Sequence, residues 1–305
     1  MAAELREGAP GTPYGGHLPT TQLVIPEIRL PFAGPPPRSD SERLRTHALA
    51  WAQRYGLIGR RGAHRLSTTA LLELGVALCG RAPAPQAEIL VCWYLWALTL
   101  DDRIDDGPWA ENGALDRFII AVEALTEGGD ADSSGEISRF DDPMLVVLVD
   151  DLWPQTRCLG GDQWRHRLVR HLIQHLRAQA TLVRVRETDK ALTLAEYLPL
   201  RRDAFGALFF FDLIDAAESL DPYEHPADTA WWNTLREHGA DIIAWTNDIH
   251  SIAKDVVCGE RFNLVSILAD TAGMDWPAAI ESAHQMVNTA VAQFTAVATR
   301  HANHR

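Results

Sequence analysis

Apolar residues recur at helical spacing along most of the chain, from about residue 40 to residue 300. Short segments that contain glycine or proline separate these runs, and alternating strand-like stretches are absent. The pattern therefore predicts an all-α fold, with a single helical domain over residues 39–305. The expected helices cover residues 40–56, 67–79, 84–106, 114–126, 142–158, 161–186, 193–219, 227–258, 261–271 and 276–300.

Residues 1–38 differ from the rest because they are rich in proline and glycine and contain no apolar stretch typical of a secretory signal. Prolines at positions 26, 31 and 35–37 exclude a helix in the second half of this segment. Several apolar residues, from Val24 to Phe32, are interleaved with these prolines. We expect an extended N-terminal arm that lies across the helical core.

Composition narrows the classes of partner. The chain has 305 residues, and 41 Asp and Glu against 28 Lys and Arg give a net charge of -13. Such a chain repels nucleic acid and anionic membrane surfaces, so we expect neither as a partner. The longest apolar stretch, residues 89–100, is too short to cross a bilayer, and the four cysteines are far apart. We therefore expect a cytoplasmic protein without membrane insertion.

Four carboxylates end a nearly all-apolar helix in the sequence DDRIDD, residues 101–106. Asp101 and Asp105 are spaced to share one helix face, and Asp102 and Asp106 form a second such pair. Like charges at this spacing destabilise a helix, and carboxylates near its C-terminus oppose the helix dipole. Bound Mg²⁺ would compensate, because it prefers carboxylate oxygens. This cluster alone leaves a solvated acidic helix end open as the alternative.

A second polar cluster, NDIHSIAKD, covers residues 247–255 and follows the apolar sequence ADIIAW. Asn247, Ser251 and Asp255 recur every fourth residue, so they share one face of a helix. An amide oxygen, a hydroxyl and a carboxylate are hard donors that suit one hard cation. Two clusters of this kind, each ending an apolar helix, are harder to explain as ordinary solvated turns than either one alone.

Together the two motifs resemble those of the bacterial class I terpene synthases (terpene cyclases), whose DDxxD motif appears as DDRIDD and whose NDxxSxxKE motif appears as NDIHSIAKD. The phrases IPEIRLPF and RFNLV also resemble that family, and the likeness covers about residues 24–300. It implies a helical bundle with a central active-site cavity, where three Mg²⁺ ions surround a substrate diphosphate. The implied metal ligands are Asp101, Asp102, Asp105, Asp106, Asn247, Ser251 and Asp255, the last in place of the usual Glu.

The resemblance also implies residues that bind the substrate. Arg201 precedes Asn247 by 46 positions, as the family's diphosphate-sensing Arg does, and Lys254 is expected to contact the diphosphate. The helix is expected to break near Phe205 and Gly206, with the carbonyl of residue 205 pointing into the pocket. The expected apolar wall comprises Tyr94, Ala97, Leu98, Phe205, Phe209 and Phe210. For each aromatic residue, a place in the ordinary core is the alternative.

The implied activity is Mg²⁺-dependent cyclisation of a linear prenyl diphosphate, farnesyl rather than geranylgeranyl diphosphate, to a terpene hydrocarbon or alcohol. Two alternatives stay open: an isoprenyl diphosphate elongase, which would carry a second DDxxD motif, and a catalytically silent helical protein that binds diphosphate. The silent alternative rests on Asp255 and on the family's closing Arg-Tyr pair, which is not found up to Arg305, so we expect a C-terminal lid to be missing. The resemblance allows a homodimer.

Overall fold

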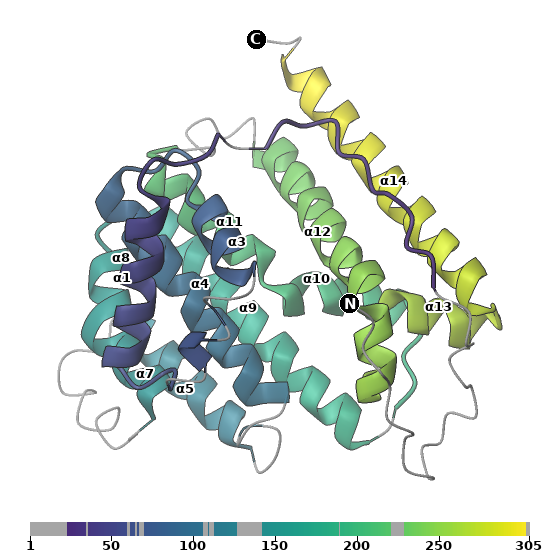
Figure 1. Cartoon of the computed structure of the whole chain (residues 1–305), viewed down its shortest axis with the longest axis horizontal. Helices are drawn as coiled ribbons and strands as arrows, with labels where there is room; N and C mark the ends of the chain where they lie inside the picture. The colour runs from purple at the N-terminus through teal and green to yellow at the C-terminus, as the bar shows by residue number, and fades with distance from the viewer. Residues whose placement is uncertain are drawn as a thin grey trace.

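The computed structural model describes residues 23–34, 36–59, 62–64, 66, 70–105, 109, 113–126, 142–188, 190–220 and 229–302. These residues form helices and connecting turns without any strand (Figure 1), which confirms the predicted all-α fold. None of these helices is long and apolar enough to cross a membrane. The helices are α1 (Ser41–Arg54), α3 (Leu71–Leu78), α4 (Ala84–Asp105), α5 (Ala114–Thr126), α7 (Pro143–Val147), the π-helical turn η1 (Leu148–Leu152), α8 (Trp153–Thr156), α9 (Asp162–Glu187), α10 (Leu194–Phe205), α11 (Ala207–Ala217), α12 (Thr229–Cys258), α13 (Leu264–Ala272) and α14 (Trp276–Ala302).

The buried apolar side chains form two clusters. One lies among α1, α3, α4, α5, α7, α8, α11 and the first part of α9. The other lies among the end of α9, α10, α12, α13 and α14. In Figure 1, α1, α7 and α8 stand on the left and α12 and α14 on the right. The short break between α10 and α11 is therefore the point where the chain passes from the second cluster into the first.

Helix α4 follows the predicted range closely, because almost every residue before its acidic end is apolar. Trp93, Trp96 and Leu100 are fully buried in the first cluster. Near the end of the helix, Arg103 donates to Asp142 Oδ2 at 2.8 Å, and its guanidinium lies 5.4 Å from the ring centre of Trp109. These contacts fix the last turn of α4, which carries the first acidic motif.

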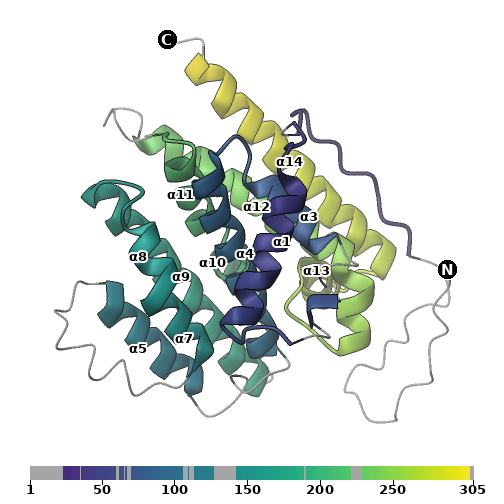
Figure 2. The same cartoon turned by 60° about the vertical axis from the view of Figure 1, so that its left-hand side comes forward.

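The described part of the N-terminal arm, residues 23–34, runs alongside α14 in both views (Figures 1 and 2). Its apolar residues Leu23, Ile25 and Ile28 pack against the second cluster. Phe32 meets the ring of Phe294 edge-on, with 5.0 Å between the ring centres. Residues 1–22 of the expected arm lie outside the described residues.

The predicted helix over residues 142–158 is present from Pro143 to Thr156, but it contains a π-helical turn that the sequence did not predict. Pro154 follows the turn and lacks the backbone N–H that would donate to the carbonyl of Asp150 in an α-helix. The start of the segment is regular: the side chain of Asp142 accepts from Met144 N at 2.8 Å, and Pro143 occupies the first turn. Residues 127–141, between the expected helices over residues 114–126 and 142–158, lie outside the described residues.

Candidate diphosphate and metal site

Helix α10 begins with a capping box that fixes the position of its first turn. The side chain of Thr193 accepts from Glu196 N at 3.2 Å, and the side chain of Glu196 accepts from Thr193 N at 2.9 Å. Tyr197 and Arg201 follow at a spacing of four residues, so both lie on one side of α10. That side faces α12, which carries the second motif.

Arg201 contacts two residues of the second motif. Its Nη2 lies 2.6 Å from Asp248 Oδ1 and donates to Asn247 Oδ1 at 3.0 Å. The guanidinium lies 5.3 Å from the ring centre of Phe205 and 5.9 Å from that of Phe262. Only 15% of the Arg201 side chain is exposed, and 1% of the Asp248 side chain. The structure thus places the predicted diphosphate-sensing Arg directly against the second motif.

Asp248 is held from three directions. Besides Arg201, the hydroxyl of Tyr197 donates to its Oδ2, and Leu264 N, at the start of α13, donates to the same oxygen at 3.2 Å. Burial acts to lower the pKa of Arg201, but the charges of Asp248 and Asp101 outweigh it and raise the pKa above its ordinary value. Arg201 therefore stays cationic although it is mostly buried.

The three predicted ligands of the second motif lie along α12 as expected. Asn247 is exposed, whereas Ser251 and Asp255 are half-buried. Ser251 Oγ donates to Asp255 Oδ2 at 2.5 Å, so the hydroxyl and the carboxylate are adjacent. Lys254 is exposed and, together with Asp255, lines a cavity of about 520 Å³ beside the last turn of α12.

Asp101 and Asp102 are exposed on the last turn of α4. The effect of Asp101 on the pKa of Arg201 shows that the first motif lies within electrostatic reach of the second. Asp106 and the side chain of Asp105 lie outside the described residues. Within the described residues, no three acidic, histidine or cysteine side chains gather as a metal-ligand group. The predicted ligand set at the second motif depends instead on an amide oxygen, a hydroxyl and one carboxylate.

The predicted helix break is present at Gly206, which has a φ of 79° and separates α10 from α11. Two side chains of α9 replace the backbone donors that the carbonyls at the end of α10 lose at the break. His175 Nδ1 donates to the carbonyl of Asp203 at 3.2 Å, and Gln179 Nε2 donates to that of Ala204 at 3.0 Å. A Cβ on residue 206 would lie 2.8 Å from the ring of Phe209. Glycine is therefore required here by both backbone conformation and space.

The residues of the expected apolar wall differ in how far they are buried. Ala97 and Leu98, one turn before the first motif, are half-buried, as is Phe210 on α11. The ring of Phe210 lies 6.3 Å from that of Tyr94, which is buried. Ile243, which the sequence analysis missed, lies one turn before Asn247 and is 42% exposed. Partly exposed apolar side chains thus lie one helical turn before each motif.

Phe209 does not fit the prediction that it lines the pocket. Its side chain is 1% exposed and packs in the first cluster, with ring centres 6.2 Å from Trp93 and 5.3 Å from His175. Phe209 is therefore a core residue that supports the helix break, which is the alternative stated above for each aromatic residue. Phe205 is half-buried beside Arg201, in keeping with its expected place.

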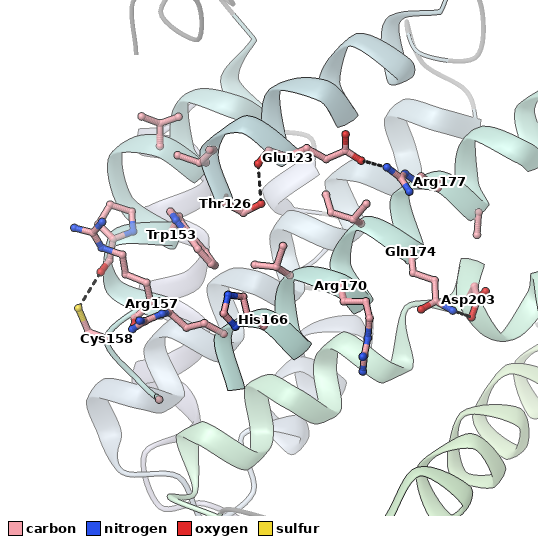
Figure 3. A pocket seen from close by; sticks show the side chains of 18 of the residues that line it. Glu123, Thr126, Trp153, Arg157, Cys158, His166, Arg170, Gln174, Arg177 and Asp203 are labelled. Atoms are coloured by element: carbon pink, nitrogen blue, oxygen red, sulfur yellow. Dashed lines mark hydrogen bonds and ion pairs between the residues drawn. The ribbon is translucent and has the colours of Figure 1, made fainter. Parts of the chain in front are cut away.

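A larger groove of about 1560 Å³ lies along α9 and is separate from this site (Figure 3). His166, Arg170, Gln174 and Arg177 follow one another along the helix in this view. Asp203 also lines the groove, two positions after Arg201 on α10 and so on a different side of that helix. Among the predicted metal and diphosphate ligands that the structure describes, none lines this groove.

Three polar residues of the site were not identified from the sequence: Tyr197, Asp248 and Asn263. Asp248 belongs to the second motif, but the sequence analysis assigned it no role. For Tyr197, the only indication in the sequence is its spacing of four residues from Arg201. Asn263, in RFNLV, donates to Asp255 Oδ2 at 2.9 Å and to the carbonyl of Asp248 at 2.8 Å. Its role depends on a turn that the sequence pattern does not specify.

A family model described as "Terpene synthase family 2, C-terminal metal binding" matches residues 92–293. The chain belongs to this terpene synthase family. The match includes both motifs and indicates an enzyme that uses a divalent metal. The class I terpene synthase resemblance of the sequence is thereby confirmed.

Named relatives agree with this assignment. This terpene synthase is 26% identical to pristinol synthase from Streptomyces pristinaespiralis, over 89% of this chain and 72% of that protein. It is also 26% identical to (+)-T-muurolol synthase from Roseiflexus castenholzii, over 81% of this chain and 74% of that protein. The crystal structure of a-eudesmol synthase matches with a TM-score of 0.75 at 21% identity, over 90% of this chain and 86% of that one. At this identity, the structural match supports the fold.

Proposed function

We propose that this terpene synthase is a Mg²⁺-dependent cyclase that ionises farnesyl diphosphate, releases diphosphate and closes the carbocation to a terpene hydrocarbon or alcohol. The observation that supports it most directly is the position of Arg201. Its guanidinium contacts Asn247 and Asp248 of the second motif and lies within the field of Asp101 of the first. A cation held against one acidic motif and within electrostatic reach of the other suits a doubly anionic group that is bound together with metal ions.

The donor set fits Mg²⁺, because Asn247, Ser251 and Asp255 present hard oxygen atoms from one face of α12. We propose that these residues, with Asp101, Asp102, Asp105 and Asp106, hold three Mg²⁺ ions. When bound, the ions would neutralise the diphosphate as it leaves the substrate carbon.

The protein's own side chains then have separate tasks. Arg201 and Lys254 bind diphosphate oxygens, and the planar guanidinium of Arg201 suits two-point binding. In this proposal, the helix break at Gly206 turns the backbone carbonyl of residue 205 toward the substrate. Apolar side chains inside each motif exclude water, which would otherwise trap the carbocation early.

The choice of farnesyl diphosphate rests on the relatives. The full name of (+)-T-muurolol synthase describes it as cyclising (2E,6E)-farnesyl diphosphate, and the 4-epi-cubebol synthase of Streptosporangium roseum, 29% identical to this chain, carries the same description. We therefore place farnesyl before geranylgeranyl diphosphate, in a cytoplasmic enzyme.

A product assay tests this function. The purified chain is incubated with Mg²⁺ and geranyl, farnesyl or geranylgeranyl diphosphate, and organic extracts are analysed by gas chromatography–mass spectrometry. We expect a cyclic product from farnesyl diphosphate that disappears in Asp101→Ala and in Asn247→Ala. Circular dichroism checks that both variants are folded. Mg²⁺-dependent binding of diphosphate without product from any of the three substrates would contradict the proposal and favour a silent binding protein.

A further inference from the structure

The turn between α12 and α13 brings one buried side chain against the second motif. Asn263 is completely buried, and its Nδ2 donates to Asp255 Oδ2 at 2.9 Å and to the carbonyl of Asp248 at 2.8 Å. Ser251 Oγ lies 3.3 Å from the same nitrogen. One amide group therefore contacts two of the three predicted ligands of the second motif.

The two oxygens of Asp255 are consequently unequal. Oδ2 accepts from both Ser251 Oγ at 2.5 Å and Asn263 Nδ2 at 2.9 Å. Within the described part of the chain, no donor reaches Oδ1. Two donors on one oxygen fix the rotation of a carboxylate and leave its other oxygen for a cation.

The turn that carries Asn263 is itself held in place. Glu260 N donates to the carbonyl of Asp255 at 2.8 Å, and Glu260 Oε1 accepts from Phe262 N at 2.7 Å. Arg186, on α9, donates to Glu260 Oε2 at 2.6 Å. The side chain of Asn263 also caps α13, because its Oδ1 accepts from Val265 N at 2.9 Å. The amide of Asn263 is therefore held at both ends.

We propose that Asn263 is a positioning residue for the metal site: it fixes Asp255 Oδ2 against Ser251, so that Oδ1 is presented to a divalent cation. This inference rests on the proposed function for the identity of the metal site. A positioning partner is important here because Asp255 is one methylene shorter than the Glu common in the family and has less freedom to adjust. Loss of the Asn263 amide leaves the ligand present but unoriented.

The variant Asn263→Ser tests this role, because serine also caps helices well but is too short to reach Asp255. Mn²⁺ is titrated into the full chain with inorganic diphosphate, and bound Mn²⁺ is followed by electron paramagnetic resonance. We expect a 10- to 100-fold weaker Mn²⁺ affinity, as is typical when the partner of a metal ligand is removed. Because Asn263→Ser also removes the buried hydrogen bond to the carbonyl of Asp248, its melting temperature, measured without metal, should fall by a few degrees, and Mn²⁺ is titrated below that temperature. Asn288→Ser on the exposed side of α14 serves as the matched control and should change neither quantity.

A double-variant comparison separates positioning from general damage. If Asn263 acts through Asp255, Asn263→Ser should weaken Mn²⁺ binding less than about twofold when Asp255→Ala is already present, because the two effects overlap. The same loss in both backgrounds, or unchanged Mn²⁺ binding by Asn263→Ser alone, would overturn the proposal. Because these titrations use no prenyl substrate, a chain that binds Mn²⁺ as expected but yields no terpene would refute the proposed cyclisation and not the role of Asn263.

Discussion

Replacing Asp248 by Asn tests the most buried contact of the site. The substitution keeps the size of the side chain but removes the charge that faces Arg201, whose side chain is only 15% exposed. An amide also has a single acceptor oxygen, whereas Asp248 accepts from Tyr197 and Leu264 N with Oδ2 and forms an ion pair with Arg201 through Oδ1. We therefore expect Asp248→Asn to leave a buried cation without its partner.

The expected cost follows from this burial. Removing one member of a buried ion pair typically lowers the free energy of unfolding by about 3–5 kcal/mol. For a chain of 305 residues, such a loss corresponds to a melting temperature lower by about 5–8 °C. The matched control is Asp203→Asn, because Asp203 lies on the same helix as Arg201 but accepts from Gln174 at the surface. This control should cost less than about 1 kcal/mol.

Denaturant unfolding, followed by circular dichroism without metal, measures both variants. The double variant Arg201→Met with Asp248→Asn should be more stable than Asp248→Asn alone, because no unpaired charge then stays buried. Our reasoning fails if Asp248→Asn unfolds within about 1 kcal/mol of the unchanged chain, or if adding Arg201→Met lowers its stability further.

Two other predictions concern the helix break. Gly206→Ala should destabilise the fold by about 1–3 kcal/mol, because the left-handed backbone and the ring of Phe209 both oppose a Cβ. The control Gly239→Ala, at a helical position with space for a Cβ, should not lower the melting temperature. An equal loss of stability in the two variants would contradict this account. Burial lowers the pKa of His175 from 6.5 to about 4. Between these values only the unfolded chain binds the proton, so stability should fall by about 3 kcal/mol as the pH drops from 6.5 to 4. When the free energy of unfolding is measured across this pH range, it should depend less steeply on pH for His175→Gln than for the unchanged chain. Equal pH dependence in the two proteins would refute this role of His175.

Much of the fold follows from the sequence, because apolar periodicity and helix-breaking residues act locally. The start of α4 after Pro83, its acidic end and the break at Gly206 all agree with the predicted positions. The π-helical turn before Pro154 was not predicted, since the apolar pattern of residues 142–158 continues through it. Periodicity indicates which side of a helix is buried, but it does not reveal a local change of hydrogen bonding.

The site was predictable where residues share a helix and unpredictable where separate helices meet. Asn247, Ser251 and Asp255 share a face of α12, so spacing alone placed them together. Tyr197 and Asn263 reach the second motif from α10 and from the start of α13, and this depends on how the helices pack. Of the neighbours Phe209 and Phe210, only the packing shows that the first belongs to the core.

The central claim is that Arg201 binds the diphosphate that leaves the substrate, and one comparison of neighbouring residues tests it. Diphosphate release from farnesyl diphosphate with Mg²⁺ is measured for the unchanged chain, Arg201→Gln and Arg202→Gln. Arg202 forms two hydrogen bonds with buried Asp241, at 2.8 and 2.7 Å, so its loss should lower stability. Below the melting temperature of each variant, we predict a rate about 100- to 1000-fold lower for Arg201→Gln, as for other lost charge-stabilising donors, and a nearly unchanged rate for Arg202→Gln. Equal rates for the two variants, or release by Arg201→Gln at the unchanged rate, would contradict the claim.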